Sequence, residues 1–379
     1  MTRLLTTLER LVGFDTQNPP GAQEAECAGW VAQTLRSFGF VVTVDLFEEG
    51  RANVIARLEN GAGPCFAFNT HMDVVPAGEG WTGDPFRLRE SGGMLFARGA
   101  CDAKGALASM LEALALLAAN RAGWRGTLMG VFVADEEASS RGAKRYAATQ
   151  PSIDLVVVGE PSGNAPIVAH KGSLRPFVRV MGRTAHSGTP DLGLNAIYQA
   201  GRLMPLITAL HEGLRAAPHP LVGPGSLTIT RAIAGCADNV VPDACDLLLD
   251  RRLIPSETEE AALAAIKAML ANAASVGIDT EILALRPTTG GAAESPIAHP
   301  IVQAALAAGG THGVHDPRPI GFQGACDFVH FRDAGAQGVV LGPGDLTVAH
   351  KPDEFVPRVE LEAAALIYRD IALSMLRHG

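Results

Sequence analysis

The first part of the chain alternates between stretches with helical spacing of apolar residues and short, almost continuous apolar runs. Residues 22–37 have the spacing of an amphipathic helix, and residues 103–119 have the length and apolar content of a buried helix. The apolar runs that predict strands are 41–47, 54–58, 65–69, 127–134 and 154–158. Because helices separate strands that are apolar on both faces, we expect an α/β fold with a mixed, mostly parallel sheet flanked by helices.

The pattern changes after about residue 172. The segments that follow predict strand 174–181, helix 195–210, strand 226–234, strand 244–253, helix 257–274 and strand 279–285. This βαββαβ order is typical of an independent small α/β layer. Later segments resemble the first part again, with helix 301–308, strand 338–341 and helix 359–376. We therefore expect a catalytic domain in two parts, 1–172 and 287–379, interrupted by an inserted domain, 173–286.

Composition narrows the class of protein. A chain of 379 residues favours two domains over one. A net charge of -9 without any cluster of Lys and Arg argues against a nucleic-acid partner and favours small-molecule ligands. No run approaches the roughly 20 apolar residues of a membrane span, and the N-terminus lacks the apolar region of a signal peptide. The six scattered cysteines are typical of free thiols, so we expect a cytoplasmic protein.

Side chains that bind metals follow three of the predicted strands. These are His71, the neighbours Glu136 and Glu137, and Glu160. Because the carboxyl ends of neighbouring strands in an open α/β sheet face one crevice, these groups should converge. Asp102, just before the helix 103–119, and His350, after a Gly-Pro-Gly turn, could reach the same crevice.

Each of these residues has a simpler explanation when it is considered alone. Asp102 could cap the helix that follows it. Glu136 and Glu137 could be solvated loop carboxylates, and a single histidine such as His71 or His350 is more often structural than a metal ligand. Convergence favours metal binding, because several carboxylates at one sheet edge repel each other unless cations neutralise them.

Five motifs in order along the chain resemble those of the M20 metallopeptidase family. They are Thr-His-Met-Asp-Val-Val-Pro at 70–76, Arg-Gly-Ala-Cys-Asp-Ala-Lys-Gly at 98–105, Asp-Glu-Glu at 135–137, Gly-Glu-Pro at 159–161 and Ala-His-Lys-Pro-Asp-Glu at 349–354. This family includes acetylornithine deacetylase, succinyl-diaminopimelate desuccinylase and glutamate carboxypeptidases. The resemblance covers essentially the whole chain, including the insert, and implies a metal-dependent hydrolase of amide bonds.

The resemblance also implies a ligand set for two metal ions. His71 and Glu160 would hold one ion, Glu137 and His350 the other, and Asp102 would bridge both. A mixed shell of histidines and carboxylates suits Zn²⁺, and Co²⁺ or Mn²⁺ could substitute. Asp73, two residues after His71, would accept the other ring N–H of that histidine and so fix the orientation of the imidazole.

The same resemblance makes Glu136 the general base that assists attack by a metal-bridging water. Spacing alone does not distinguish Glu136 from Glu137. Our physical argument is that adjacent residues of an extended chain point to opposite sides, so that Glu137 can bind metal while Glu136 faces the water.

The predicted insert carries three further candidate residues. His186 resembles the family's lid histidine, which reaches the active site of the neighbouring subunit and donates a hydrogen bond to the oxyanion. Asn239 and Arg252 match positions that hold the substrate's carboxylate, and Arg252 is preferred to Arg251 only by position. The resemblance therefore implies a homodimer formed through the insert.

The function implied is removal of a short acyl group from an N-acyl-L-amino acid, as acetylornithine deacetylase does in arginine biosynthesis. A desuccinylase or a glutamate carboxypeptidase acting on dipeptide-like substrates is the alternative within the family, because pocket side chains decide specificity. A metal-free binding protein is the alternative outside this class, although all five presumptive ligands and the presumptive base are present.

Overall fold

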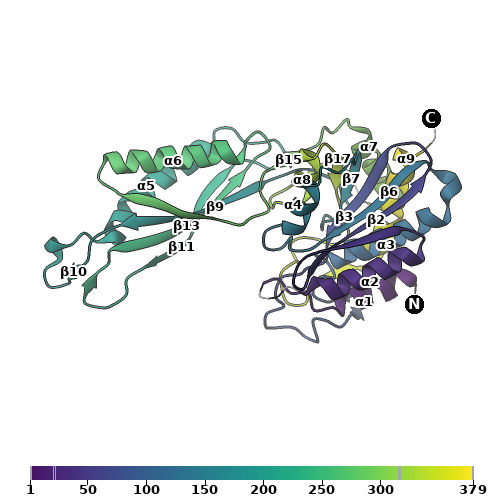
Figure 1. Ribbon diagram of the computed structural model, residues 1–379, viewed down its shortest axis with the longest axis horizontal. Coiled ribbons are helices and arrows are strands. Elements are labelled where there is room, and N and C mark those ends of the chain that lie inside the picture. Colours follow the sequence, from purple (N-terminus) through teal and green to yellow (C-terminus); the bar gives the residue numbers. More distant parts are fainter. Residues whose placement is uncertain (1, 20, 22, 315–316, 378–379) are drawn as a thin grey trace. The chain divides into compact units, whose positions relative to one another are not determined.

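A computed structural model describes residues 2–19, 21, 23–314 and 317–377, and these residues form two compact units (Figure 1). The first unit contains the chain up to Val168, residues Ser295–Gly321, and the chain from Cys326 onward. The second unit contains Ala169–Glu294 and Phe322–Ala325, and is therefore an insertion into the first. The domain boundaries expected from the sequence, at 172/173 and 286/287, lie a few residues inside the second unit.

A mixed sheet forms the centre of the first unit. Its neighbouring strands are, in order, β1 (Val41–Glu48), β2 (Arg51–Asn60), β6 (Gly126–Val133), β3 (Cys65–His71), β7 (Leu155–Val158) and β17 (Gln337–Val340). Strands β6, β3, β7 and β17 run parallel, whereas β2 joins β6 and β1 joins β2 in antiparallel pairing. Every residue of β3 and β6 is buried, as the continuous apolar runs predict.

Helices flank this sheet and supply the rest of the core. They are α1 (Arg3–Val12), α2 (Glu24–Ser37), α3 (Lys104–Ala119), α4 (Arg141–Ala147), α7 (Pro300–Thr311), α8 (Phe328–Asp333) and α9 (Arg358–Met375). Helix α3 contacts β3, α1 and α9, and α9 also contacts α7. The predicted fold class, a mostly parallel sheet between helices, is confirmed. Helix α1 was not predicted, although Leu4, Leu8 and Leu11 have helical spacing and are buried.

A small sheet at the start of α9 connects two segments that are distant in sequence. Its strands are β4 (Arg89–Ser91), β5 (Met94–Phe96) and β18 (Phe355–Pro357), in the order β18-β5-β4. Phe355 is the register partner of Phe96, and their rings lie 5.4 Å apart between centroids. This pairing brings the segment before β18 next to the segment that leads into α3.

The second unit has the predicted βαββαβ order. Its elements are β9 (Gly172–Met181), α5 (Ala196–Leu214), β11 (Ser226–Ala234), β13 (Ala244–Leu253), α6 (Glu259–Ser275) and β14 (Thr280–Arg286). The strands lie in the order β11-β13-β9-β14. Alternate residues of β13 are buried, and the apolar ones among them pack with α5 and α6 in a separate hydrophobic core.

Two shorter pairs of strands remain, one in the second unit and one at the end of the central sheet beyond β17. Strands β10 (Ala185–His186) and β12 (Val240–Val241) pair with each other, and β15 (Ala293–Glu294) pairs with the end of β8 (Ile167–His170). Within the part of the chain that the structure describes, no helix is both long enough and apolar enough to cross a membrane.

Candidate metal centre

Three neighbouring parallel strands bring the candidate ligands to one edge of the sheet. Strand β3 ends at His71, a turn with Glu136 and Glu137 follows β6, and Glu160 lies two residues after the end of β7. Because β3 pairs in parallel with both β6 and β7, the residues that follow these strands lie at the same end.

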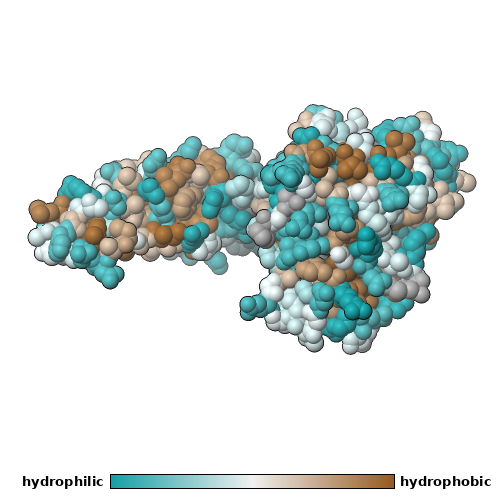
Figure 2. All heavy atoms as spheres, turned by 60° about the horizontal axis from the view of Figure 1, so that its bottom comes forward, coloured by the Kyte–Doolittle hydropathy of each residue, from teal (hydrophilic) through white to brown (hydrophobic). Residues whose placement is uncertain are grey.

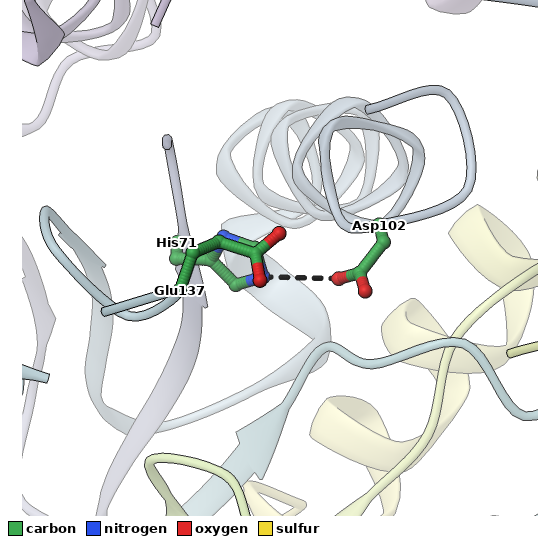
Figure 3. A group of neighbouring side chains, drawn as sticks. All are labelled: His71, Asp102 and Glu137. Atoms are coloured by element: carbon green, nitrogen blue, oxygen red, sulfur yellow. Dashed lines mark hydrogen bonds and ion pairs between the residues drawn. The ribbon is translucent and has the colours of Figure 1, made fainter. Parts of the chain in front are cut away.

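Asp102 lies between two histidines. Its Oδ1 is 3.2 Å from Nε2 of His71, and its Oδ2 is 3.3 Å from Nε2 of His350. Glu137 joins the same group, because its Oε2 is 3.2 Å from Nε2 of His350. Figure 3 shows His71, Asp102 and Glu137, whose candidate ligand atoms all lie within 4.8 Å of one another. Direct contacts between side chains thus bring together four of the five predicted ligands.

Asp102 does not cap the helix that follows it. The N-cap position of α3 is occupied by Ala103, and the Asp102 carboxylate faces the histidines instead. The simpler explanation of Asp102 as a helix cap is therefore wrong.

Glu160, the fifth predicted ligand, is buried beside this group. Burial and the negative charge of Asp102 raise its pKa well above the usual value for a glutamic acid. Burial and the charge of Glu160 raise the pKa of Glu136 in the same way. The carboxyl groups therefore crowd one another, and each resists ionisation while its neighbours are charged.

The chemistry of this donor set fits divalent cations. Glu137 Oε1 is buried and has no hydrogen-bond partner among the described residues. Hydrogen bonds to Asp102 and Glu137 raise the pKa of His350 to about 10, and for His71 hydrogen bonds to Asp102 and Asp73 outweigh burial and raise the pKa well above its usual value. Positive charge is thus favoured at both histidines, which is the charge that metal ions would bring. Histidines with carboxylates form a shell suited to Zn²⁺.

Asp73 organises the backbone on one side of this group. Its two carboxylate oxygens accept the N–H groups of Glu136 and Glu137, each at 3.1 Å. The Nδ1 atom of His71 lies 2.9 Å from the carbonyl oxygen of Asp73 and 3.6 Å from its carboxylate. The His71 ring therefore lies closer to the backbone carbonyl of Asp73 than to the Asp73 carboxylate, which we expected to fix the ring.

Glu136 and Glu137 lie in a turn and not in an extended segment. Strand β6 ends at Val133, and Asp135 has a φ of 71°. The premise that alternation along an extended chain separates the two glutamates is therefore wrong. The turn and its two hydrogen bonds to Asp73 decide where the two side chains point.

A buried polar network behind Asp73 was not predicted from the sequence. Asn18 donates to Asp73 at 2.9 Å and to Asp135 at 3.0 Å, and Arg51 donates to Asn18 at 2.9 Å. Arg51 also pairs with Glu24 at 2.7 Å and with Asp135 at 2.9 Å. In sequence these residues belong to loops, a helix and a strand, and no local pattern indicates that they meet.

Two predicted residues lie together in the second unit. His186 pairs with Val240 in the β10–β12 ladder, and the N–H of Ser187 donates to the carbonyl oxygen of Asn239 at 2.9 Å. Both His186 and Asn239 are exposed. The Nδ1 atom of His186 accepts the N–H of Gly188 at 2.9 Å, so the neutral ring carries its proton on Nε2.

The two candidate arginines of β13 lie on opposite faces of their sheet. Arg251 is buried and pairs with Glu257, whereas Arg252 lies on the more exposed face and pairs with Asp250 at 2.7 Å. A substrate carboxylate could compete with Asp250 for Arg252 but has no access to Arg251. The two arginines therefore differ in exposure, and the substrate-binding role of Arg252 stays a prediction.

Cysteine chemistry has little support in this structure. All six cysteines are free, and burial raises the pKa of the Cys101 and Cys326 thiols well above the usual range. Asp327, next to Cys326, is more notable, because it is buried and neither carboxylate oxygen has a hydrogen-bond partner among the described residues. Burial raises its pKa to about 6.

Comparisons with known proteins agree with this description. The acetylornithine deacetylase of Myxococcus xanthus is 31% identical over 386 residues, which cover 97% of each chain. The N-acetyl-L-citrulline deacetylase of Xanthomonas campestris is 32% identical, with 96% of each chain covered.

Solved structures share the fold at lower sequence identity. An M20 family metallo-carboxypeptidase from Sulfolobus solfataricus has a TM-score of 0.83 at 18% identity, with 99% of each chain covered. A dinuclear metal-binding peptidase of the M20 family from Bacillus subtilis has a TM-score of 0.74 at 20% identity, covering 99% of this chain and 98% of that one. The family model of Peptidase family M20/M25/M40 matches residues 67–374, and the chain therefore belongs to this family of amide-bond hydrolases.

Proposed function

We propose that the protein removes a short acyl group from an N-acyl-L-amino acid, using two metal ions. Relatives named acetylornithine deacetylase and N-acetyl-L-citrulline deacetylase support this substrate class. The observation that carries the dinuclear site is the position of Asp102, whose two oxygens face two different histidines. A carboxylate in this position can serve two ions at once.

In this proposal His71 and Glu160 would hold one ion, Glu137 and His350 would hold the other, and Asp102 would be a ligand of both. Zn²⁺ is the proposed metal, with Co²⁺ or Mn²⁺ as substitutes. Such ions, when bound, lower the pKa of a water molecule and polarise the acyl carbonyl.

Glu136 is the proposed general base. It takes a proton from the attacking water, the water oxygen bonds to the acyl carbon, and the C–N bond then breaks. The same carboxylic acid returns its proton to the departing nitrogen, so that a carboxylic acid and a free amine are released.

The second unit supplies the proposed oxyanion donor and carboxylate-binding residues. His186 would donate from Nε2, because the Gly188 N–H occupies its other ring nitrogen. Asn239 and Arg252 would bind the substrate's carboxylate, for which the planar guanidinium is well suited.

A homodimer through the second unit is part of this proposal. Strand β11 is an edge strand with mostly exposed residues, and unpaired edges favour pairing with another chain. Leu192, Ile197 and Tyr198, near the start of α5, are large apolar side chains that are 71%, 47% and 73% exposed. Figure 2 shows apolar patches between polar side chains over the second unit.

The free cysteines suit a reducing compartment, and we propose that the protein is located in the cytoplasm.

The test is a set of steady-state rates on N-acetylornithine, N-acetylcitrulline, succinyl-diaminopimelate and folyl-glutamate. We expect the highest kcat/KM on an acetylated amino acid, loss of activity after chelation, and recovery with Zn²⁺. Preference for the succinyl or folyl substrate would replace the substrate assignment. Absence of hydrolysis on every substrate, with and without metal, would favour a non-catalytic binding protein.

A further inference from the structure

Glu354 is a buried carboxylate that the proposed reaction does not use. It lies four residues after His350, directly before β18, and its side chain is 1% exposed. It belongs to the last of the five motifs, yet among the described residues its carboxylate makes no hydrogen bond or ion pair with the side chain of a proposed ligand. A charged group of this kind is costly to bury, so its partners indicate what it does.

Those partners all belong to the segment that carries Asp102. Oε1 of Glu354 accepts the backbone N–H of Cys101 at 2.9 Å and that of Asp102 at 3.0 Å. Oε2 pairs with the guanidinium of Arg98, and the Glu354 carbonyl oxygen accepts the N–H of Ala97 at 3.1 Å. One residue therefore holds residues 97–102 at four points.

Several contacts fix the position of Arg98, the partner of Glu354. Arg98 is buried, its guanidinium lies over the ring of Trp81 at 5.2 Å, and it donates to the carbonyl oxygens of Pro76 and Ala77, each at 3.3 Å. These contacts leave the Glu354 carboxylate little freedom to move. Two consecutive N–H groups on one of its oxygens then fix the direction of the backbone from which the Asp102 side chain projects.

His350 lies at the other end of the short segment 350–354, which ends at Glu354. Its side chain is 49% exposed, and among the described residues its ring pairs with Asp102 and Glu137 alone. Residues 350–354 follow a tight path, with positive φ at His350 and Asp353. Glu354 therefore ties the backbone of one proposed ligand to the short segment that holds another.

We infer that Glu354 is a positioning residue, which couples the Asp102 turn to the His350 segment and so sets the spacing of two metal ligands that are 248 residues apart in sequence. Asp73 makes the same kind of contact on the other side of the site, where it accepts the N–H groups of Glu136 and Glu137. This inference rests on the proposed function, in which Asp102 and His350 bind metal.

The substitution Glu354→Gln tests the coupling with little change in size. Its amide must place an NH₂ group against either Arg98 or the two backbone N–H groups, so one set of contacts is lost. Glu362→Gln is the matched control, because Glu362 is a partly exposed glutamate whose side chain is 44% exposed and pairs with Arg358 at 3.0 Å. Asp102→Ala, which removes a proposed ligand outright, is the reference for a damaged site.

The experiment is a Co²⁺ titration of the full-length, chelator-treated protein, followed by visible absorption, with thermal unfolding of the metal-free proteins beside it. We expect Glu354→Gln to bind Co²⁺ about 10- to 100-fold more weakly, with an altered absorption band, while Glu362→Gln matches the wild type. If Glu354→Gln does not fold, Arg98→Lys replaces it, with the same direction of change.

The outcomes distinguish a failure of the positioning role of Glu354 from a failure of the proposed ligand set. Unchanged Co²⁺ affinity and spectrum in a folded variant overturn the positioning role and leave the proposed function intact. A lower melting temperature of the metal-free Glu354→Gln variant, without any change in Co²⁺ binding, also overturns the positioning role. Glu354 would then contribute only to the stability of the fold. A wild type that binds no Co²⁺, or Asp102→Ala that binds as the wild type does, overturns the ligand set itself.

Discussion

Glu136 and Glu137 are neighbours in sequence but have different surroundings. Glu137 contacts His350 at 3.2 Å, whereas the charges around Glu136 are mainly those of Glu160, His71 and Asp327. Both backbone N–H groups donate to Asp73, so the difference lies in the side chains. At the scale of single residues, the two glutamates therefore differ in whether the carboxylate contacts another proposed metal ligand, as that of Glu137 does.

The first prediction compares these two glutamates. Glu136→Gln should retain its metal content while turnover falls about 10²- to 10⁴-fold, the range for loss of a general base. Glu137→Gln should lose metal as well as activity, because it replaces a carboxylate of the donor set. Elemental analysis beside steady-state kinetics separates the two effects. The reverse pattern of metal loss would exchange the two roles.

The second prediction concerns the proton on Glu24, which is buried and pairs with Arg51. Burial, together with the charges of Asp73 and Asp135, raises the pKa of Glu24 from 4.5 to about 7. The folded protein therefore keeps a proton that the unfolded chain releases between these pH values. The stabilising contribution of Glu24 is full below about pH 4.5 and is lost as the pH rises through about 7.

Glu24→Gln removes this titration and keeps an oxygen for Arg51. Relative to the wild type, the variant should gain on the order of 1–3 kcal/mol in free energy of unfolding between pH 4.5 and 7.5. Urea unfolding of the metal-free proteins at both pH values measures this change. Glu26→Gln, an exposed neighbour in α2, should follow the wild type. Parallel curves for wild type and Glu24→Gln would contradict the prediction.

At the scale of the element, the close packing of α3 on the sheet positions the ligands of β3 and β7. Gly159, between β7 and Glu160, makes this packing possible. A Cβ atom there would lie 2.9 Å from both Ala106 Cβ and Met110 Cε of α3, and 3.2 Å from Thr70 Cβ. Any side chain at 159 must therefore move α3 or the end of β7.

The third prediction is that Gly159→Ala destabilises the protein by about 1–3 kcal/mol through overpacking. Gly29→Ala is the contrasting variant, because Gly29 lies within α2, is exposed, and has open space within 4 Å of the place that an alanine Cβ would take. It should gain about 0.5–1 kcal/mol, the difference between alanine and glycine in a helix. Urea unfolding of both variants provides the measurement, and equal effects would exclude a special role for position 159.

At the scale of the whole molecule, the proposed reaction needs groups from both units. The candidate ligands and Glu136 belong to the first unit, whereas His186, Asn239 and Arg252 belong to the second. Residues His186 and Asn239 are exposed, and large apolar side chains near the start of α5 are exposed as well. A homodimer would give both features a role, because one subunit could supply His186 to the site of its partner.

The fourth prediction tests this arrangement with hybrid dimers. Glu136→Gln and His186→Ala should each be nearly inactive, but a refolded equimolar mixture should recover roughly a quarter of wild-type activity, because half of its dimers are hybrids with one complete site. Tyr198→Asp, in the apolar patch, should yield monomers in light scattering and prevent recovery. A mixture as inactive as its components would show that His186 acts within its own subunit, or not at all.

Much of this organisation can be read from the sequence, because it depends on local patterns. Continuous apolar runs predicted β3, β6 and β7, since strands buried on both faces need apolar residues throughout. The change of pattern near residue 172 predicted the insertion and its βαββαβ order. Polar residues after strands indicated His71, Glu137 and Glu160, because the ends of parallel strands share one edge.

Other features were decided only by the tertiary structure, because they depend on contacts between distant segments. Spacing could not separate Glu136 from Glu137, and the turn held by Asp73 places both. Asn18 has no local pattern that indicates a role, and the motif that contains Glu354 does not indicate its partners, since both side chains form hydrogen bonds with segments more than 50 residues away. The sequence by itself determined which residue types lie at the sheet edge, and packing decided their orientation, charge and partners.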